Sequence, residues 1–404
     1  MNLISPAHVP VTATGIMGEA YAADPWPALH ALRAQGPVVW HETYRRWLVT
    51  THEHVHATLN DYERFTVEGT SMVALFGKEA FISMDERGPH DELRNVWAAA
   101  FRKTVLEGLR APAGRIVERL VASVAARLHA GEAVEIIPAL CRPLPTLVIA
   151  HMMGVPEEML AQVIGWTDAM SAGGPAYQTG AAAAVAQQAR EAAKTALADY
   201  LTSLLRARRV QPGDDLISTL AVSAAARSRG DDALVPNIRQ LLFAGNETTA
   251  KWLANIFVSY AEHPDVWREL GANRALVRPA NEEVLRWQGV TGSLVRKVRG
   301  QGAQIADVAL EDGAEVTLLL AAANRDPARY ENPDAFDIHR PAKANLGFGF
   351  GLHHCLGLNL ARLEAEMAVQ AALDQFPPFS IAAPYGYSTL PVRGPLPVVI
   401  RAMH

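Results

Sequence analysis

The stretch Phe348-Gly349-Phe350-Gly351-Leu352-His353-His354-Cys355-Leu356-Gly357 decides how the rest of the chain is interpreted. Its glycines allow a tight backbone path and a close approach to a flat ligand. The stretch runs directly into a helix predicted from Leu358 to Leu373. A thiolate just ahead of a helix is stabilised by the helix dipole and by free amide donors. Amide hydrogen bonds also tune how strongly such a sulfur donates electron density to a metal.

The chain has only one other cysteine, Cys141. A zinc ion or an iron–sulfur cluster at Cys355 would require further cysteines, and none lies nearby in the sequence. Cys141 sits in the apolar stretch Ile136 to Val148, where a buried and inert thiol is expected. A disulfide between the two cysteines is not expected, because the N-terminus lacks the pattern of a signal peptide.

A second group of residues with chemical potential is Ala244-Gly245-Asn246-Glu247-Thr248-Thr249, inside a helix predicted from Leu234 to Ala261. Its flanks are apolar, and an acid within an apolar helix requires an explanation because burying a charge is unfavourable. One explanation is a solvated helix face, with the threonine hydroxyl bonded to a carbonyl one turn earlier. The other is a functional acid–hydroxyl pair.

Both stretches resemble motifs of the cytochrome P-450 family, F-G-x-G-x-H-x-C-x-G and A/G-G-x-D/E-T-T/S. The resemblance implies a haem b cofactor with Cys355 as the axial ligand of its iron. It further implies that Thr248 hydrogen-bonds dioxygen, that Glu247 supplies protons, and that the small pair Ala244 and Gly245 lets the helix pass over the haem. The remaining haem-binding residues of the cysteine loop would be Phe348, Gly349, Gly351, His353 and Gly357.

Other matches to the family surround these motifs. Glu283 and Arg286 share a helix face, where they form either one surface ion pair contributing less than about 1 kcal/mol or the family's structural E-x-x-R pair. The haem propionates are expected to meet His90 and Arg94, which lie one helical turn apart, together with His353 and Arg296. Lys297 and Arg299 are neighbours of Arg296, and the sequence leaves open which of the three cations binds a propionate.

The composition limits the class of protein. The chain has 404 residues and a net charge of −5, so it lacks the basic field that attracts nucleic acid. Its apolar run Val316 to Ala323 is far shorter than the roughly 20 residues of a membrane span. We expect a cytoplasmic protein without membrane or nucleic-acid partners, and a monomer.

Apolar periodicity predicts a mainly α fold with a smaller β region, that is, one cytochrome P-450 domain over residues 1–404, with 1–23 a candidate flexible segment. Strands are predicted at Val38–Trp40 and Trp47–Thr50, in short pieces from Val295 to Val316, and around Leu390 and Val398. Apart from the two helices above, the predicted helices are Trp26–Gln35, Pro89–Phe101, Leu106–His129, Pro156–Ala169, Ala181–Arg208 and Arg278–Arg286.

The resemblance implies a monooxygenase that uses dioxygen to hydroxylate, epoxidise or O-dealkylate an organic substrate. Electrons would come from an iron–sulfur ferredoxin and its NAD(P)H-dependent reductase, because the chain carries no flavin or nicotinamide domain. The acidic ferredoxin is expected to dock near Arg102, Lys103, Arg110 and Arg362.

The substrate is expected to be small and hydrophobic, either aromatic or terpenoid-like, with steroids and polyketides left open. Candidate substrate contacts are mostly apolar: Val73, Leu75, Phe243, Leu294, Val295, Thr389 and Leu390. Two other functions remain as alternatives, a peroxide-driven peroxygenase and a non-catalytic haem protein such as a gas sensor. The intact Glu247-Thr248 pair argues against both.

Overall fold

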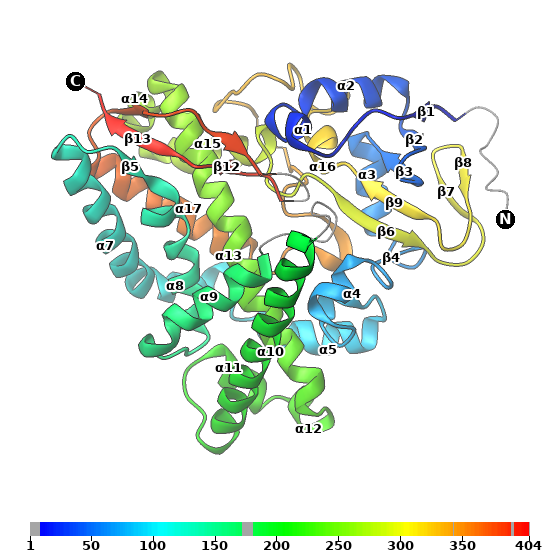
Figure 1. Ribbon diagram of the computed structural model, residues 1–404, viewed down its shortest axis with the longest axis horizontal. Coiled ribbons are helices and arrows are strands. Elements are labelled where there is room, and N and C mark those ends of the chain that lie inside the picture. The colour runs from blue at the N-terminus through cyan, green and yellow to red at the C-terminus, as the bar shows by residue number, and fades with distance from the viewer. Residues whose placement is uncertain (1–8, 172–180, 342, 389–391, 404) are drawn as a thin grey trace.

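The computed structural model describes residues 9–171, 181–341, 343–388 and 392–403. Helices dominate, and a smaller β region lies along one side of the molecule (Figure 1). None of the described helices is both long and apolar enough to cross a membrane. The fold class predicted from the sequence, mainly α with a smaller β region, is confirmed.

The helices fall into long elements that build the core and short ones that connect them. The long helices are α2 (Trp26–Gln35), α3 (His52–Asn60), α5 (Arg87–Ala98), α7 (Arg110–His129), α8 (Pro143–Met152), α9 (Leu160–Ser171), α10 (Ala181–Val210), α13 (Asp231–Glu262), α14 (Pro264–Ala272), α15 (Val277–Trp287) and α17 (Leu358–Gln375). The short helices are α1 (Glu19–Ala23), α4 (Ser71–Phe76), α6 (Lys103–Leu106), α11 (Leu216–Ala221), α12 (Ala224–Ser228) and α16 (Leu320–Asn324).

Helix α13 is the central element of the helical part (Figure 1). Its C-terminal half is buried on nearly every side, and Leu253, Ile256 and Phe257 have no exposed surface. A mainly apolar helix of this kind must be covered all round, and α8, α10, α15 and α17 cover it. The middle of α13 is thereby fixed in position from several directions.

The largest sheet has the strand order β1-β2-β3-β9-β6-β4. Strand β6 pairs antiparallel with β9, and Arg296 lies opposite Val316. Side chains alternate between the two faces of a strand, so Arg296 and Val298 point to the same, buried side while Lys297 points to the other. The strands are β1 (Val11–Thr12), β2 (Val38–His41), β3 (Arg46–Val49), β4 (Phe65–Thr66), β5 (Val134–Glu135), β6 (Leu294–Val298), β7 (Ala303–Ile305), β8 (Val308–Leu310), β9 (Glu315–Leu318), β10 (Phe379–Ile381), β11 (Gly386–Tyr387), β12 (Pro395–Leu396) and β13 (Val399–Ala402).

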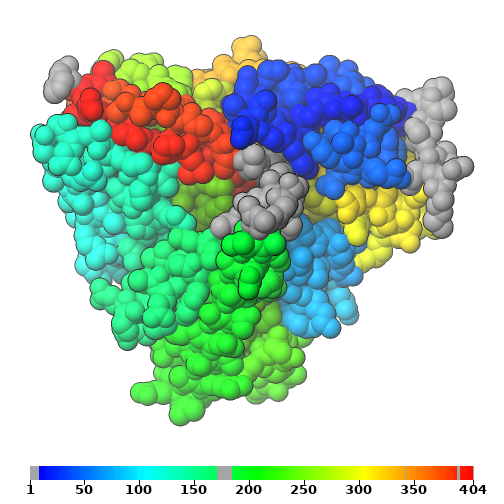
Figure 2. Space-filling model, in the orientation of Figure 1, coloured from blue at the N-terminus to red at the C-terminus, as the bar shows by residue number. Residues whose placement is uncertain are grey.

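The N-terminal residues 11–23 are part of the packed structure, contrary to the expected flexible segment. Strand β1 pairs with β2, and Ile16, Tyr21 and Ala22 are buried. The N-terminal elements lie beside the C-terminal strands on one face of the molecule (Figure 2). There the buried Arg393 donates from Nε to the Ala22 carbonyl at 3.3 Å, so apolar contacts and a buried guanidinium both hold this segment.

Most predicted helices are present, but some begin or end at other residues than predicted. The predicted Trp26–Gln35 matches α2 at both ends. The predicted Leu106–His129 divides into α6, a 3-10 turn and α7, which begins only at Arg110. Likewise, residues 157–159 form a 3-10 turn before α9 begins at Leu160. Of the last two predicted strands, the one around Val398 corresponds to β13, and Leu390 lies outside the described residues.

Glu364 is an acid inside the core, on helix α17. It is 2% exposed, and its Oε2 has no hydrogen-bond partner. Burial raises the pKa of this carboxyl to about 8. The folded protein therefore binds a proton that the unfolded chain releases near the ordinary value of 4.5. This difference makes the contribution of Glu364 to stability fall as the pH rises from about 4.5 to about 8.

We predict that Glu364→Gln flattens this part of the stability profile, because glutamine fills the same volume and cannot ionise. Denaturant unfolding at pH 5.5 and pH 8.5 should show a smaller loss of stability in the variant, by about 1–3 kcal/mol. Glu366→Gln, on the same helix but only half-buried, is the control and should keep the parent profile. An unchanged profile in Glu364→Gln would refute the assignment.

Candidate active site

The cysteine loop is shaped by two glycines in the left-handed backbone region, Gly349 with a φ of 68° and Gly351 with a φ of 73°. A Cβ atom at Gly351 would lie 2.4 Å from the Leu59 carbonyl oxygen of α3. The loop closes on itself, since the Cys355 amide donates to the Phe348 carbonyl at 3.0 Å. Glycine is therefore required at position 351 by both conformation and space.

The surroundings of the Cys355 thiol shift its pKa in opposite directions. Burial raises its pKa above the ordinary value, while the amides of Gly357 and Leu358 and the cations Arg94 and Arg362 act in the opposite direction. The amide donors expected from the sequence are present, but burial outweighs them for a thiol without a metal. A cation bound at the sulfur would reverse this balance, because metals bind the thiolate form.

The middle of α13 lies opposite this loop. The ring of Trp252 on α13 meets the ring of Phe348 edge-on, with centroids 5.7 Å apart. Along a helix that is otherwise buried, residues 243–245, 247 and 248 are only half-buried. The Thr248 hydroxyl donates to the Ala244 carbonyl at 2.9 Å, which is the back-bond considered above as the alternative to a functional role. The hydroxyl oxygen can still accept a hydrogen bond.

Glu247 is held by an ion pair within its own helix. Its Oε1 lies 2.7 Å from the Nζ of Lys251, one turn later. The same Nζ donates to the carbonyl oxygen of Val392 at 2.8 Å. Glu247 is thereby connected to the C-terminal part of the chain.

Arg296 is a buried cation near the cysteine loop. It is 5% exposed, and burial lowers its pKa to about 10. Its side-chain hydrogen bond goes to the neighbouring Val295 carbonyl at 2.9 Å. Within the described part of the chain, no carboxylate forms an ion pair with it. By contrast, Arg299 is exposed and pairs with Glu68 at 3.0 Å.

The other predicted propionate ligands gather at the same place. The rings of His90 and His353 are 5.3 Å apart, edge to face. His90 is fully buried, and its Nε2 has no hydrogen-bond partner. Arg94 donates to the His354 carbonyl at 2.6 Å, and the Nε2 of His353 lies 2.7 Å from Asp85. Thus, His353 and Arg94 already have protein partners, while His90 keeps a free nitrogen.

These residues fit a haem. The buried guanidinium of Arg296 calls for an anionic acceptor, which a propionate provides. The Nδ1 of His90 faces Asp91 at 2.8 Å, so its free Nε2 can donate to a propionate only when the ring is protonated. A Cβ atom at Gly357 would meet no protein atom within 4 Å, and one at Gly245 would make only an ordinary contact with Ile149. Protein packing therefore does not require glycine at these two positions, whereas a flat group lying against them would.

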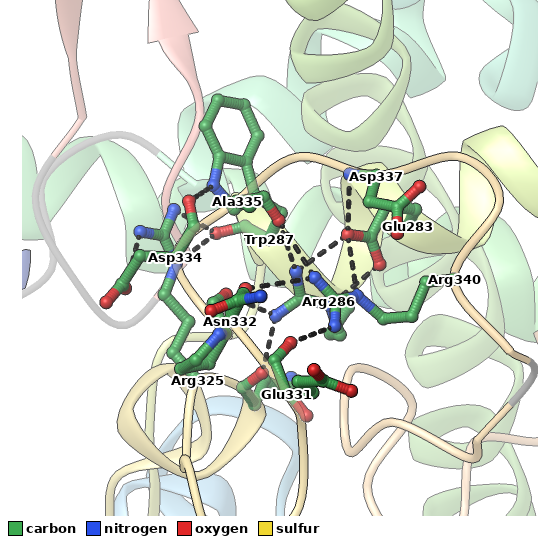
Figure 3. Close-up of polar contacts among 12 residues, drawn as sticks. Glu283, Arg286, Trp287, Arg325, Glu331, Asn332, Asp334, Ala335, Asp337 and Arg340 are labelled. Atoms are coloured by element: carbon green, nitrogen blue, oxygen red, sulfur yellow. Dashed lines mark hydrogen bonds and ion pairs between the residues drawn. The ribbon is translucent and has the colours of Figure 1, made fainter.

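The pair Glu283–Arg286 is buried and two-pronged, with Nη2–Oε1 and Nε–Oε2 distances of 2.7 Å (Figure 3). Arg286 also donates to the carbonyls of Asn324, Pro333 and Ala335. Asn324 in turn accepts from the Leu346 amide at 2.7 Å, next to the cysteine loop. The network ties α15 to the segment that precedes Cys355, so the interpretation as a surface ion pair is wrong.

The predicted substrate contacts come from several elements. Val73 and Leu75 lie on α4, Phe243 on α13, and Leu294 and Val295 on β6, all half-buried. Thr389 and Leu390 lie outside the described residues. Phe76, which the sequence analysis did not select, packs edge-on against Phe243 with ring centroids 5.7 Å apart.

Two charged residues of the site, Asp85 and Lys251, were not predicted from the sequence. Asp85 is buried and accepts hydrogen bonds from Thr66, the Val67 amide and His353. Burial alone would raise its pKa, but these hydrogen bonds bring it below the ordinary value. Lys251 could have been noticed from its spacing of four residues after Glu247, which favours an ion pair on a helix.

Comparison with known proteins gives a family for this architecture. The family described as Cytochrome P450 matches residues 30–379. The chain is 34% identical over 388 residues to the cytochrome P450 monooxygenase PikC of Streptomyces venezuelae, with 93% of this chain and 89% of that protein covered. It is 32% identical to the mycinamicin IV hydroxylase/epoxidase of Micromonospora griseorubida, with 84% of each chain covered.

Solved structures agree. The structure of CYP109E1 from Bacillus megaterium in complex with testosterone has a TM-score of 0.85 at 27% identity and covers 96% of this chain and 100% of that chain. The structure of CalO2 has a TM-score of 0.86 at 27% identity, covering 97% and 99%. These matches extend over nearly the whole length described above.

We predict that Arg296→Met weakens haem retention, because a propionate would lose a charged hydrogen bond worth about 1–3 kcal/mol. Haem transfer to apomyoglobin should accelerate roughly ten-fold or more. Lys297→Met and Arg299→Met are the matched controls and should release haem at the parent rate. If Arg299→Met releases haem while Arg296→Met does not, the propionate has been assigned to the wrong arginine.

Proposed function

Because the chain belongs to the cytochrome P450 family and is therefore a haem b monooxygenase, we propose that Cys355 is the iron ligand and that Glu247 and Thr248 handle protons during oxidation of a neutral, hydrophobic substrate. Dioxygen is the oxidant. One of its oxygen atoms enters the substrate, by hydroxylation, epoxidation or O-dealkylation.

One observation carries this proposal. The loop that presents Cys355 contacts α13 at Trp252, about one helical turn after the stretch in which Ala244, Glu247 and Thr248 are only half-buried. A cysteine sulfur on the loop and an acid–hydroxyl pair on α13 would suit a flat, iron-bearing cofactor that the two elements hold together. The unpaired Arg296 at the edge of the site suits the propionates of that cofactor.

When bound, the haem supplies dioxygen activation, and electron donation from a thiolate favours cleavage of the O–O bond. The protein tunes this donation through the amides of Gly357 and Leu358. Cations near the sulfur, Arg94 and Arg362, act in the same sense because they stabilise its negative charge. The apolar neighbours of the loop exclude water and keep these interactions strong.

On the side formed by α13, the chain must deliver protons into an apolar site, next to the position where dioxygen would bind. The hydroxyl oxygen of Thr248 can accept a hydrogen bond while it donates to Ala244, and it would thereby orient a water molecule or dioxygen. Glu247, one residue earlier, is ionisable and would pass protons to that point. Because consecutive helical residues point about 100° apart, a water molecule would have to bridge the two groups.

For the electron supply, we propose an acidic ferredoxin served by an NAD(P)H-dependent reductase in the cytoplasm. Two of the four cations expected to receive it are engaged: Arg110 pairs with Glu107 at 2.5 Å, and Arg362 pairs with Glu282 at 2.6 Å. Arg102 and Lys103 are exposed, and neither forms an ion pair within the described residues. The docking surface therefore centres on Arg102 and Lys103 beside Asn359 of α17.

The substrate class rests on the lining and on the relatives. The candidate contacts that the structure describes are apolar, namely Val73, Leu75, Phe243, Leu294 and Val295. One relative is named for mycinamicin IV and one solved structure holds testosterone. A neutral hydrophobic molecule is the substrate we propose, on the ground of the apolar candidate contacts, with aromatic or terpenoid compounds to be tested beside steroids and polyketides by the low- to high-spin shift of the haem spectrum.

We predict that Thr248→Ala uncouples the reaction. Haem and substrate binding do not need the hydroxyl, but correct orientation of protons does, so product per nicotinamide should fall at least roughly three-fold while released hydrogen peroxide rises. Glu247→Gln should instead slow the whole cycle, because proton supply becomes limiting. Thr249→Ala is the control, since a helical step of about 100° turns it away from the same point, where it is buried.

Peroxide leakage from Thr249→Ala together with tight coupling in Thr248→Ala would contradict this register. Product formation driven by hydrogen peroxide alone, at the rate of the complete electron-transfer system, would favour the peroxygenase alternative.

For the electron donor, we predict that the double variant Arg102→Glu/Lys103→Glu raises the KM for a plant-type or bacterial ferredoxin several-fold. The reason is like-charge repulsion, so the effect should shrink as ionic strength rises and the charges are screened. Stopped-flow reduction at two salt concentrations measures it. Arg227→Glu on α12 is the control, and equal effects in both variants would contradict the docking surface.

A further inference from the structure

Lys251 makes two contacts that join separate parts of the site. On α13 its ammonium group lies 2.7 Å from the Glu247 carboxylate. Across the site it donates to the Val392 carbonyl at 2.8 Å, 141 residues away in the sequence. The Lys251 side chain is 16% exposed and that of Glu247 30%, so both contacts are partly shielded from bulk water.

The C-terminal hairpin formed by β11 and β12 is built to receive this lysine. A Cβ atom at Gly394 would lie 2.6 Å from the Cγ of Lys251, so only glycine lets the lysine stem pass. Ser388 braces the same turn, since its hydroxyl donates to the Val392 carbonyl at 3.1 Å and accepts from the Gly394 amide at 3.1 Å. The Arg393 amide donates to the Val290 carbonyl at 2.7 Å. The carbonyl that Lys251 meets is therefore firmly positioned.

The other charges near Glu247 do not replace Lys251. Asp168 on α9 is close enough for Glu247 to raise its pKa, although burial contributes more. Asp168 is paired with Arg142. Glu247 thus has an acid on one side and Lys251 as its ion-pair partner, so the orientation of its carboxylate depends on the lysine.

We propose that Lys251 is a positioning residue that fixes the Glu247 carboxylate against the C-terminal hairpin, so that proton supply to the site depends on where this hairpin lies. The proposal rests on the proton-handling role of Glu247 proposed above. The lysine thus acts on the Glu247 carboxylate from one side and is held by the Val392 carbonyl on the other.

The test uses the haem-loaded protein and the variants Lys251→Met, which keeps the length without the charge, and Lys251→Arg, which keeps the charge. Lys251→Met should lower kcat roughly ten-fold, as expected when a catalytic group is misplaced, with KM nearly unchanged. Lys251→Arg should recover most of the rate. Gly394→Ala, which displaces the lysine stem without removing it, should resemble Lys251→Met.

A second measurement does not depend on turnover. In hydrogen–deuterium exchange without substrate, peptides that contain Val392 to Gly394 should exchange faster in Lys251→Met than in the parent, because the carbonyl has lost its donor. Arg206→Met is the matched control: it removes an ion pair with Asp231 at the far end of α13 and should change neither kcat nor exchange in this segment.

The double variant Glu247→Gln/Lys251→Met separates the two proposals. If Lys251 acts through Glu247, adding Lys251→Met to Glu247→Gln should lower kcat no further. A full additional loss, or unchanged kcat and exchange in Lys251→Met, would overturn the inference about Lys251. If Glu247→Gln itself leaves kcat unchanged, the proton-handling role of Glu247 fails instead.

Discussion

The structure depends on holding one buried sulfur where it can carry negative charge. Burial raises the pKa of Cys355, and amides at the start of α17 together with two arginines oppose this effect. A charge in such surroundings is acceptable only when it is paired, and a bound cation completes the pairing. The tight loop, the contact of Gly351 with α3, and the Glu283–Arg286 network all keep the sulfur at this position. The cysteine loop is therefore held in place on the side of the site where the sulfur carries its negative charge.

On the side of the site formed by α13, protons must enter an apolar interior. Helix α13 is buried over most of its length, yet it carries Glu247, Thr248 and Lys251 on the stretch nearest the loop. The Glu247 carboxylate is tolerated there because the ammonium group of Lys251 lies 2.7 Å away and neutralises its charge. Arg296, in contrast, forms no ion pair with a carboxylate among the described residues, although Asp85 is near enough to favour its charge, and an anionic ligand would supply the missing partner. Glu247 is thus paired within the protein, Arg296 is available to the cofactor, and Glu364 is kept neutral by its raised pKa.

The sequence predicted what is encoded locally. The cysteine loop, the acid–threonine pair and the long periodic helices depend on neighbours within a few turns, and α2 and α13 lie close to their predicted ranges. Contacts between distant segments escaped prediction. Asp85 meets His353 from 268 residues away, and Lys251 meets Val392 from 141 residues away. Helix α3, with its three histidines, was missed because its residues favour no structure strongly on their own.

The most direct test of the central claim is the absorption spectrum of the ferrous carbon monoxide complex, recorded for the parent and for single cysteine variants. Cys141 is buried and free, so Cys141→Ser controls for the loss of a core thiol. The parent and Cys141→Ser should show the strongly red-shifted band that thiolate ligation produces, and Cys355→His should lose it while retaining haem. Persistence of that band in Cys355→His would contradict the assignment of Cys355 as the ligand.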